Sequence, residues 1–248
     1  VGLPPPVGDP LENEPALIAY YRPKSQTAEF CRSIRTNLKF MDPDQPIQTM
    51  VITSPSPREG KTTVAASIAT AMAMSGGKTV LVDTDMRRPR LHRLFRVKNN
   101  RGFSTGLIGE PVLSDIVQDS VVPGLDLITC GPIPPNPAEL LHSRRFCDLL
   151  DELRAHYDYV IFDSPPVLAV TDSLILGKHA DGVLMVARVG ETSKGAILQT
   201  FRRLQAIGVR VFGCILNRVD TEREDYRYYS YYYSGKYQYG EEETATEV

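Results

Sequence analysis

A short stretch of the chain, SPSPREGKTT at 54–63, carries the residue types that bind a phosphate group. Glycine, lysine and threonine follow one another at 60–62 and match the second half of the phosphate-loop pattern GxxxxGK[ST]. The first glycine of that pattern would fall at Pro55, so its first half is not matched. In such a loop the backbone N–H groups face an anion, Lys61 reaches the β- and γ-phosphates, and the Thr62 hydroxyl binds Mg²⁺. The stretch predicts a nucleoside triphosphate site; a surface turn that contains GKT by chance is the alternative.

Two further stretches place carboxylates where a buried strand is expected to end, VLVDTDMRRP at 80–89 and YVIFDSPP at 159–166. Asp83 and Asp85 are two residues apart and so share one side of an extended chain. Asp163 follows an apolar run in the same way. Open α/β sheets bind ligands at the carboxyl ends of their strands, where a Walker-B aspartate holds Mg²⁺ or its waters. Either stretch alone could supply a capping or solvated aspartate, but three converging strand ends favour a metal–nucleotide site.

The rest of the pattern predicts the elements that must position these residues. Continuous apolar runs predict buried parallel strands at 49–54, 79–85, 125–130, 159–164, 182–189 and 211–219. Apolar residues at helical spacing predict helices at 61–77, 143–157 and 193–208, in alternation with the strands. We therefore expect an α/β fold with a doubly wound, mostly parallel sheet in a three-layer αβα arrangement.

Composition divides the chain into three parts. The proline-rich start, 1–24, indicates a linker or N-terminal extension, compatible with the stub of a longer chain. Residues 25–220 are numerous enough for one domain with its own core, since 42% of the chain is hydrophobic. Residues 221–248 lose the apolar pattern and are expected to form a flexible tail. No apolar run is long enough to span a bilayer, so no transmembrane helix is expected.

Charge and cysteine usage exclude some classes of function. The formal net charge is −2, which gives no general attraction to nucleic acid. The four cysteines are scattered and form no CxxC pair, so we expect buried thiols rather than disulfides or zinc ligands.

Taken together, these motifs resemble those of the bacterial tyrosine kinases that use a P-loop fold, within the deviant-Walker group that also holds ParA- and MinD-like ATPases. SPREGKTT is similar to the family's Walker A, VLVDTDMRRP to its Walker A′ (pattern DxDxRxP) and VIFDSPP to its Walker B. GPIPPNPAELL at 131–141 is similar to a further family segment, and the resemblance covers about residues 20–240 in the expected order. Arg58 departs from the family, in which many members have glycine there. Arg58 is expected to change the stiffness of the loop and to add a cation near the phosphates.

The resemblance implies a protein-tyrosine kinase that uses ATP and Mg²⁺. In this family Lys61 would neutralise phosphate charge, Thr62 would ligate Mg²⁺, and Asp83 and Asp163 would organise the metal and its waters. Asp83, or else Asp85, could accept the proton of the tyrosine. The implied catalytic residues are Lys61, Asp83, Asp85, Arg87 and Asp163.

The resemblance also suggests roles for two further residues, Arg87 and Asn217. Arg87 either stabilises charge on the transferring phosphoryl group or forms a structural ion pair. Asn217, near the end of the last expected strand, looks placed to bind adenine. With it, the residues expected to contact the nucleotide are Ser56, Pro57, Arg58, Glu59, Gly60, Lys61, Thr62, Thr63 and Asn217.

The segment AEFCRSIRTNLKF at 28–40 separates into two faces when it is drawn as a helix. Phe30, Ile34 and Leu38 fall on one face and predict contact with a core. EFCRSIR matches the family's ExxRxxR motif at Glu29, Arg32 and Arg35, on the far side. Spacing alone favours an ordinary solvated face. The resemblance instead implies an oligomer contact in a closed ring, usually of eight subunits.

Eight of the twelve tyrosines fall between 226 and 239. Adjacent tyrosines match neither strand nor helix periodicity. One interpretation is a low-complexity tail without a function of its own. On a mobile tether, however, any tyrosine can reach an active site, including that of a neighbouring subunit. The resemblance identifies the cluster as the site of autophosphorylation, and the expected acceptors are Tyr226, Tyr228, Tyr229, Tyr231, Tyr232, Tyr233, Tyr237 and Tyr239.

The resemblance also implies partners and a location. Family members act at the cytoplasmic face of the membrane in the export of extracellular or capsular polysaccharide, through a fused or separate transmembrane adaptor that activates them. A tyrosine phosphatase would reverse the modification.

Three other interpretations compete with the kinase. A partition- or division-type ATPase would carry a second lysine at the position of Ser56 and would lack the tyrosines. A ring-forming scaffold whose tail serves another kinase would lack activity of its own. GFSTG at 102–106 matches a hydrolase motif, but no strand is expected before it.

Overall fold

The computed structural model describes residues 9–42, 46–109 and 112–220, and the elements of secondary structure all lie in the compact unit that ends at Asn217. A seven-stranded sheet forms its centre, in the order β3-β4-β2-β5-β1-β6-β7. All neighbouring strands are parallel except β3 and β4. The strands are β1 (Thr49–Thr53), β2 (Thr79–Asp83), β3 (Gln118–Asp119), β4 (Leu125–Ile128), β5 (Tyr159–Asp163), β6 (Gly182–Arg188) and β7 (Val211–Asn217).

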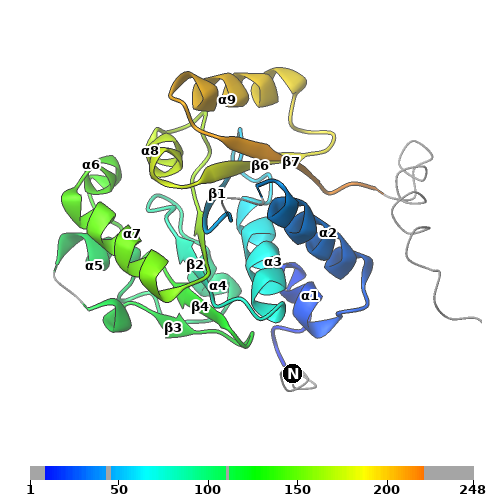
Figure 1. The fold of residues 1–248 in the computed structure, drawn as a ribbon, viewed down its shortest axis with the longest axis horizontal. Helices are drawn as coiled ribbons and strands as arrows, with labels where there is room; N and C mark the ends of the chain where they lie inside the picture. The colour runs from blue at the N-terminus through cyan, green and yellow to red at the C-terminus, as the bar shows by residue number, and fades with distance from the viewer. Residues whose placement is uncertain (1–8, 43–45, 110–111, 221–248) are drawn as a thin grey trace, which may run out of the picture. The chain divides into compact units, whose positions relative to one another are not determined.

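Helices cover both faces of this sheet. The α-helices are α1 (Ile18–Tyr21), α2 (Gln26–Phe40), α3 (Lys61–Met74), α4 (Leu91–Leu94), α5 (Phe103–Ile108), α6 (Pro137–Leu141), α7 (Arg144–His156), α8 (Asp172–His179) and α9 (Lys194–Ala206). The described residues also form short 3₁₀ helices at Pro15–Leu17 and Leu113–Asp115. Figure 1 shows α2 and α3 on one side of the sheet, and α7 and α8 on the other.

Successive side chains of the central strand β1 point to opposite faces of the sheet, and each face is covered by its own layer of helices. Met50 and Ile52 point into the core beneath α3, whereas Val51 points into a second core beneath α7 and α8. Because both faces of each inner strand are buried, the three central residues of β1 and of β2 are all apolar rather than alternating with polar ones. The predicted doubly wound, three-layer fold with a mostly parallel sheet is confirmed, and the six predicted strands all form.

The structure contains helices that the sequence analysis did not predict, namely α4, α5, α6 and α8. It differs from the expectation in three further places. β3 was not predicted, because two edge residues leave no periodic pattern. The segment 1–24 was expected to be a linker, yet Leu17 and Tyr20 are buried in the core beneath α3. In α2 the expected apolar face is turned: Leu38 is buried, but Phe30 is 40% exposed, and the small residues Ala28 and Cys31 face the core instead.

The four cysteines differ in their burial. Cys31 and Cys130 are buried thiols, Cys147 is half-buried and Cys214 is exposed, contrary to the expectation of uniform burial. Within the described ranges no cluster of His, Cys, Asp and Glu has the makings of a metal site of its own. None of the described helices has the length and apolar character that crossing a bilayer requires. Residues 221–248, with the predicted tyrosine cluster, lie outside the described part.

Candidate active site at the carboxyl ends of the strands

The loop between β1 and α3 ends in a helix whose first turn has no side-chain cap. Gly60 is the N-cap residue and cannot supply one, so the N–H groups of the first turn are available to an anion. Gly60 has φ +94°, a left-handed conformation, and a Cβ there would lie 2.1 Å from Asn217 Nδ2. Arg58 also has positive φ, +67°, which is costly for a residue other than glycine. The family position at which glycine is common is thus one where glycine fits the backbone better.

Glu59 holds this loop in place and faces away from solvent. It is only 4% exposed, and its carboxylate accepts hydrogen bonds from the Ser56 N–H (2.9 Å) and from the Thr192 hydroxyl (2.5 Å). The Asn217 side-chain amide donates to the Glu59 carbonyl at 2.9 Å. Glu59 and Asn217, both predicted to contact the nucleotide, are therefore used to brace the phosphate loop against the ends of β6 and β7.

Lys61 lies at the start of α3 and forms an ion pair with Asp85, with 3.2 Å between Nζ and Oδ2. Both side chains are largely buried, with 13% and 7% exposed. Asp85 also accepts hydrogen bonds from the N–H groups of Arg87 and Arg88, at 3.3 and 3.0 Å. The carboxylate is thus fixed by its own turn and positions the lysine for a phosphate.

Asp83 and Asp163 are partners in the register of the neighbouring strands β2 and β5, so both carboxylates leave the same edge of the sheet. Asp83 is fully buried and accepts hydrogen bonds from the N–H groups of Arg90 and Leu91, each at 3.0 Å. Asp163 is 1% exposed, and the nearby Thr62 hydroxyl acts to lower the pKa of its carboxyl. Its Oδ1 atom is buried with no hydrogen-bond partner among the described residues.

Burial raises the pKa of both carboxyls. For Asp83 the second cause is the nearby negative charge of Asp163, and the two backbone hydrogen bonds oppose the shift. For Asp163 burial outweighs the opposing effect of the Lys61 charge and of the Thr62 hydroxyl. Two adjacent buried carboxylates, one with an orphaned oxygen, are unfavourable unless a cation or a proton joins them. The carboxylate and hydroxyl oxygens of Asp83, Asp163 and Thr62 fit a hard divalent cation such as Mg²⁺.

Arg87 forms a bidentate ion pair with Asp172, at 3.0 Å (Nε–Oδ2) and 3.2 Å (Nη2–Oδ1). Of the two alternatives for this arginine, the geometry supports the structural ion pair, which ties the turn after β2 to the start of α8. Asp172 is fully buried and was missed by the sequence analysis. Its only signal is an acidic residue at a helix start, and that signal is too common to identify an ion-pair partner.

The expected oligomer-contact residues divide into two groups in the single chain. Arg32 forms an i,i+3 ion pair with Glu29 and also donates to the Pro23 carbonyl at 2.8 Å. Arg35 instead donates to the carbonyl of Ala71 on α3 at 3.3 Å. Two of the three residues are therefore on the surface, and the third is partly used inside the fold.

A family model described as an AAA domain matches residues 58–210, from the phosphate loop to the approach to β7. The tyrosine-protein kinase YwqD of Bacillus subtilis is 41% identical over 214 residues, which are 86% of this chain and 90% of YwqD. The chain belongs to the bacterial tyrosine-protein kinases. Longer relatives named as members of this family match over 29% and 31% of their own length only.

Two solved structures have a similar fold. The crystal structure of the chimerical protein CapA2B2 has a TM-score of 0.80 at 40% identity, covering 82% of this chain and 90% of that one. The septum site-determining protein MinD from Pyrococcus horikoshii, complexed with Mg-ADP, has a TM-score of 0.61 at 21% identity over 71% of this chain and 72% of that chain, and shares the fold. The protein-tyrosine kinase class and a P-loop that uses a nucleotide follow from the family. The role of each site residue remains a prediction.

Proposed function

We propose that this chain transfers the γ-phosphoryl group of ATP to tyrosines in the C-terminal tail, residues 221–248, of a second copy. One observation carries the proposal: Lys61, Thr62, Asp83, Asp85 and Asp163 meet at a single edge of the sheet, next to the uncapped start of α3. A triphosphate needs cationic and N–H groups, and its metal needs oxygen ligands. Both kinds of group are present there.

The chemistry divides among these residues. A phenol oxygen attacks the γ-phosphorus, the bond from that phosphorus to the β–γ bridging oxygen breaks, and ADP leaves. Lys61 and the first-turn N–H groups of α3 balance the charge that develops on the phosphoryl oxygens. Asp83 or Asp85 accepts the phenol proton, since both carboxylates lie at the edge of the sheet where the phosphate loop ends. Thr62, Asp83 and Asp163 would hold Mg²⁺, which supplies further charge neutralisation when bound.

Phosphorylation in trans requires that copies meet, and we assign that contact to α2. Glu29 is 63% exposed and Arg32 is 36% exposed, so both can exchange their mutual ion pair for one with a neighbour. A head-to-tail contact of this kind closes into a ring, and the family resemblance favours eight subunits. Charge reversal at Glu29 (Glu29→Arg) should give a smaller species in sedimentation velocity. Restoration of the ring by the double variant Glu29→Arg with Arg32→Glu would support the contact.

The tail then regulates the ring. It carries seven acidic and three basic residues, and each phosphotyrosine adds about −1.5 to −2. Phosphorylated tails held side by side repel one another, so autophosphorylation loosens the ring and a tyrosine phosphatase restores it. Equal sedimentation coefficients for phosphorylated and phosphatase-treated protein would defeat this step.

We place this cycle at the inner face of the membrane, under a fused or separate transmembrane adaptor, in the synthesis or export of an extracellular or capsular polysaccharide. This placement rests on the family resemblance and on the longer relatives, of which this chain matches less than a third.

The activity itself has a direct test. The purified chain is incubated with Mg-ATP and probed for phosphotyrosine, with Lys61→Met as the control for contaminating kinases. Tyrosine phosphorylation by the wild type alone supports the proposal. ATP hydrolysis without phosphotyrosine would point to an ATPase switch, and neither activity would point to a scaffold.

A further inference from the structure

The turn after β2 opens the most basic stretch of the chain. Residues 87–101 carry seven arginines and lysines and no acidic residue, although the whole chain has a net charge of −2. The rest of the chain therefore carries a net charge of −9. Such an imbalance within fifteen residues creates a local positive potential that the net charge conceals.

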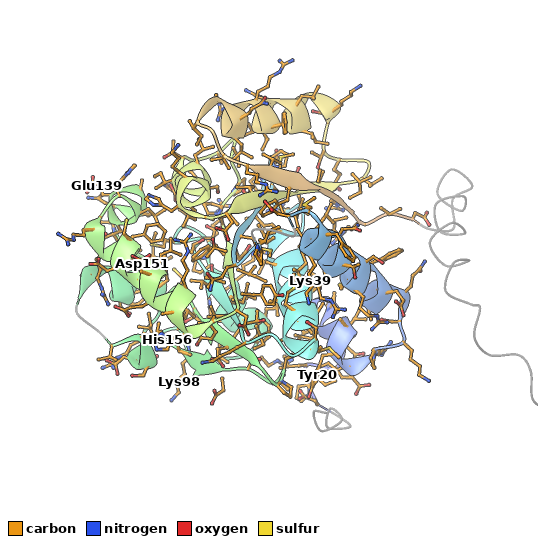
Figure 2. The ribbon with its side chains drawn as sticks, in the orientation of Figure 1. Tyr20, Lys39, Lys98, Glu139, Asp151 and His156 are labelled. Carbon is orange, nitrogen blue, oxygen red and sulfur yellow. The ribbon has the colours of Figure 1, made fainter. Side chains whose placement is uncertain are left out.

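Most of these cations are exposed and have no carboxylate partner. Arg87 forms an ion pair with Asp172, and Arg96 lies near Asp9. No ion pair among the described residues involves the other five, which we call the basic strip: Arg88, Arg90, Arg93, Lys98 and Arg101. Figure 2 shows the Lys98 side chain pointing away from the body of the domain. Neighbouring unpaired cations repel one another, and an anionic partner would relieve that repulsion.

Two contacts join the basic strip to the candidate active site and fix its far end. The Arg90 N–H binds Asp83, and the Arg90 charge acts on Asp163, so the strip begins at the two buried carboxylates. At the other end, Asn99 exchanges hydrogen bonds with Gly131, at 3.1 and 2.9 Å, and the Thr129 hydroxyl donates to the Arg101 carbonyl at 3.1 Å. The loop that carries Lys98 and Arg101 is therefore held in place by the end of β4.

We propose that the basic strip binds the acidic tail, residues 221–248, of a second copy of this chain and delivers its tyrosines to the active site. The inference rests on the proposed function and adds how the substrate is recognised. Charge complementarity selects this occupant. The tail carries seven acids against three bases, with Glu222, Glu224 and Asp225 before the tyrosines and Glu241, Glu242 and Glu243 after them. Binding of the acidic flanks leaves the uncharged tyrosines free to enter the site, so that no single tyrosine context would be required.

The test compares two substrates of the full-length enzyme. One is a tagged full chain carrying Lys61→Met, which presents the tail but cannot phosphorylate itself. The other is a short uncharged tyrosine peptide. Selectivity is the ratio of the two kcat/KM values. The double variant Arg93→Gln with Arg101→Gln should lower this ratio about ten-fold, chiefly through a higher KM for the tail-bearing copy, and should weaken its salt dependence.

The matched control is Arg144→Gln with Arg202→Gln. These are also two exposed arginines without a carboxylate partner in the described residues, and they lie on α7 and α9. The control should keep the wild-type selectivity. If both double variants have the same selectivity as the wild type, the basic strip does not bind the tail. If Arg93→Gln with Arg101→Gln instead loses binding to anionic phospholipid vesicles and keeps its selectivity, the strip faces lipid and the proposal is overturned. If the wild type phosphorylates neither substrate, the proposed function fails as well.

Discussion

At the amino ends of the strands, Asp181 accepts hydrogen bonds from the N–H groups of Gln48 and Thr49, at 2.9 and 2.7 Å. At the carboxyl ends, Asp83 and Asp163 face each other in register, and one oxygen of Asp163 has no partner in the described residues. Both edges belong to the same sheet and carry buried or half-buried carboxylates. Within the described part of the chain, Asp181 is also balanced by Arg154 at 3.7 Å, whereas the Asp83 and Asp163 charges are left for another group to balance. This difference separates a functional site from a structural one.

The largest expected effect comes from replacing one carboxylate by an amide at each edge of the sheet, first at the carboxyl edge. Asp163→Asn should lower tyrosine phosphorylation at least about 1,000-fold, because the metal loses a ligand. In the nucleotide-free protein it should raise the Tm at pH 8 by about 3–6 °C, since an uncompensated buried charge disappears. Phosphotyrosine assays and differential scanning calorimetry measure the two effects.

The matched change at the amino edge is Asp181→Asn. It should do the opposite, lowering the Tm by about 3–6 °C through the weakened hydrogen bonds and leaving the kinase activity within two-fold or so of the wild type. A stabilised Asp181→Asn or a destabilised Asp163→Asn would remove the distinction between the two edges.

A second change, with a smaller effect on activity, is the replacement of arginine by lysine. Arg87→Lys breaks the bidentate pair with the fully buried Asp172, so we expect a Tm lower by about 4–8 °C and about ten-fold less activity. Arg210→Lys is the control at the amino edge, where the partner Asp42 is 25% exposed. That pair is partly solvated and should change the Tm by less than about 2 °C. Equal shifts in the two variants would show that Arg87 has no special role.

The pH dependence of stability sharpens the comparison further. The folded-state pKa values of Asp83 and Asp163 lie above the usual carboxyl value of 3.8 because of burial, so the folded protein binds more protons than the unfolded chain. Their contribution to the free energy of unfolding is therefore most favourable near pH 4 and is lost as the pH rises through the raised pKa values. Urea titrations without Mg²⁺ should show this decline, and Asp163→Asn should flatten it. An unchanged slope in the variant would contradict the assignment.

The smallest effects concern two left-handed residues, one at each edge. Arg58→Gly in the phosphate loop should stabilise the protein by up to about 1 kcal/mol, because glycine adopts φ +67° without strain. Gly76→Ala, at φ +91° after α3, should destabilise it by about 1 kcal/mol although the site is open, and should leave activity unchanged. Urea unfolding measures both changes. A stabilised Gly76→Ala would show that backbone conformation does not decide these positions.

Local pattern predicted most of the sheet and the start of α3, because strands buried on both faces are continuous apolar runs and GKT follows the first of them. It could not predict β3, which depends on pairing with β4. Nor could it place Phe30: periodicity orders the faces of α2 but does not decide whether a large residue or the small pair Ala28 and Cys31 packs against α3.

The candidate site was predictable where a motif carries the chemistry and not where tertiary contacts do. The carboxylates Asp83 and Asp163 come from strand ends, and their register in adjacent strands brings them together as expected. The Arg87–Asp172 pair joins residues 85 positions apart, and the brace formed by Glu59 and Thr192 joins residues 133 apart. No local signal specifies such pairs.

The measurement that tests the central claim most directly is ATP binding by titration calorimetry, with and without Mg²⁺, in the wild type and in Asp163→Asn. If Thr62, Asp83 and Asp163 hold the metal beside the triphosphate, Mg²⁺ should strengthen ATP binding at least about ten-fold in the wild type. The variant should lose that gain while it still binds ATP alone, because Lys61 and the first turn of α3 are intact. An equal gain from Mg²⁺ in both proteins would contradict the account.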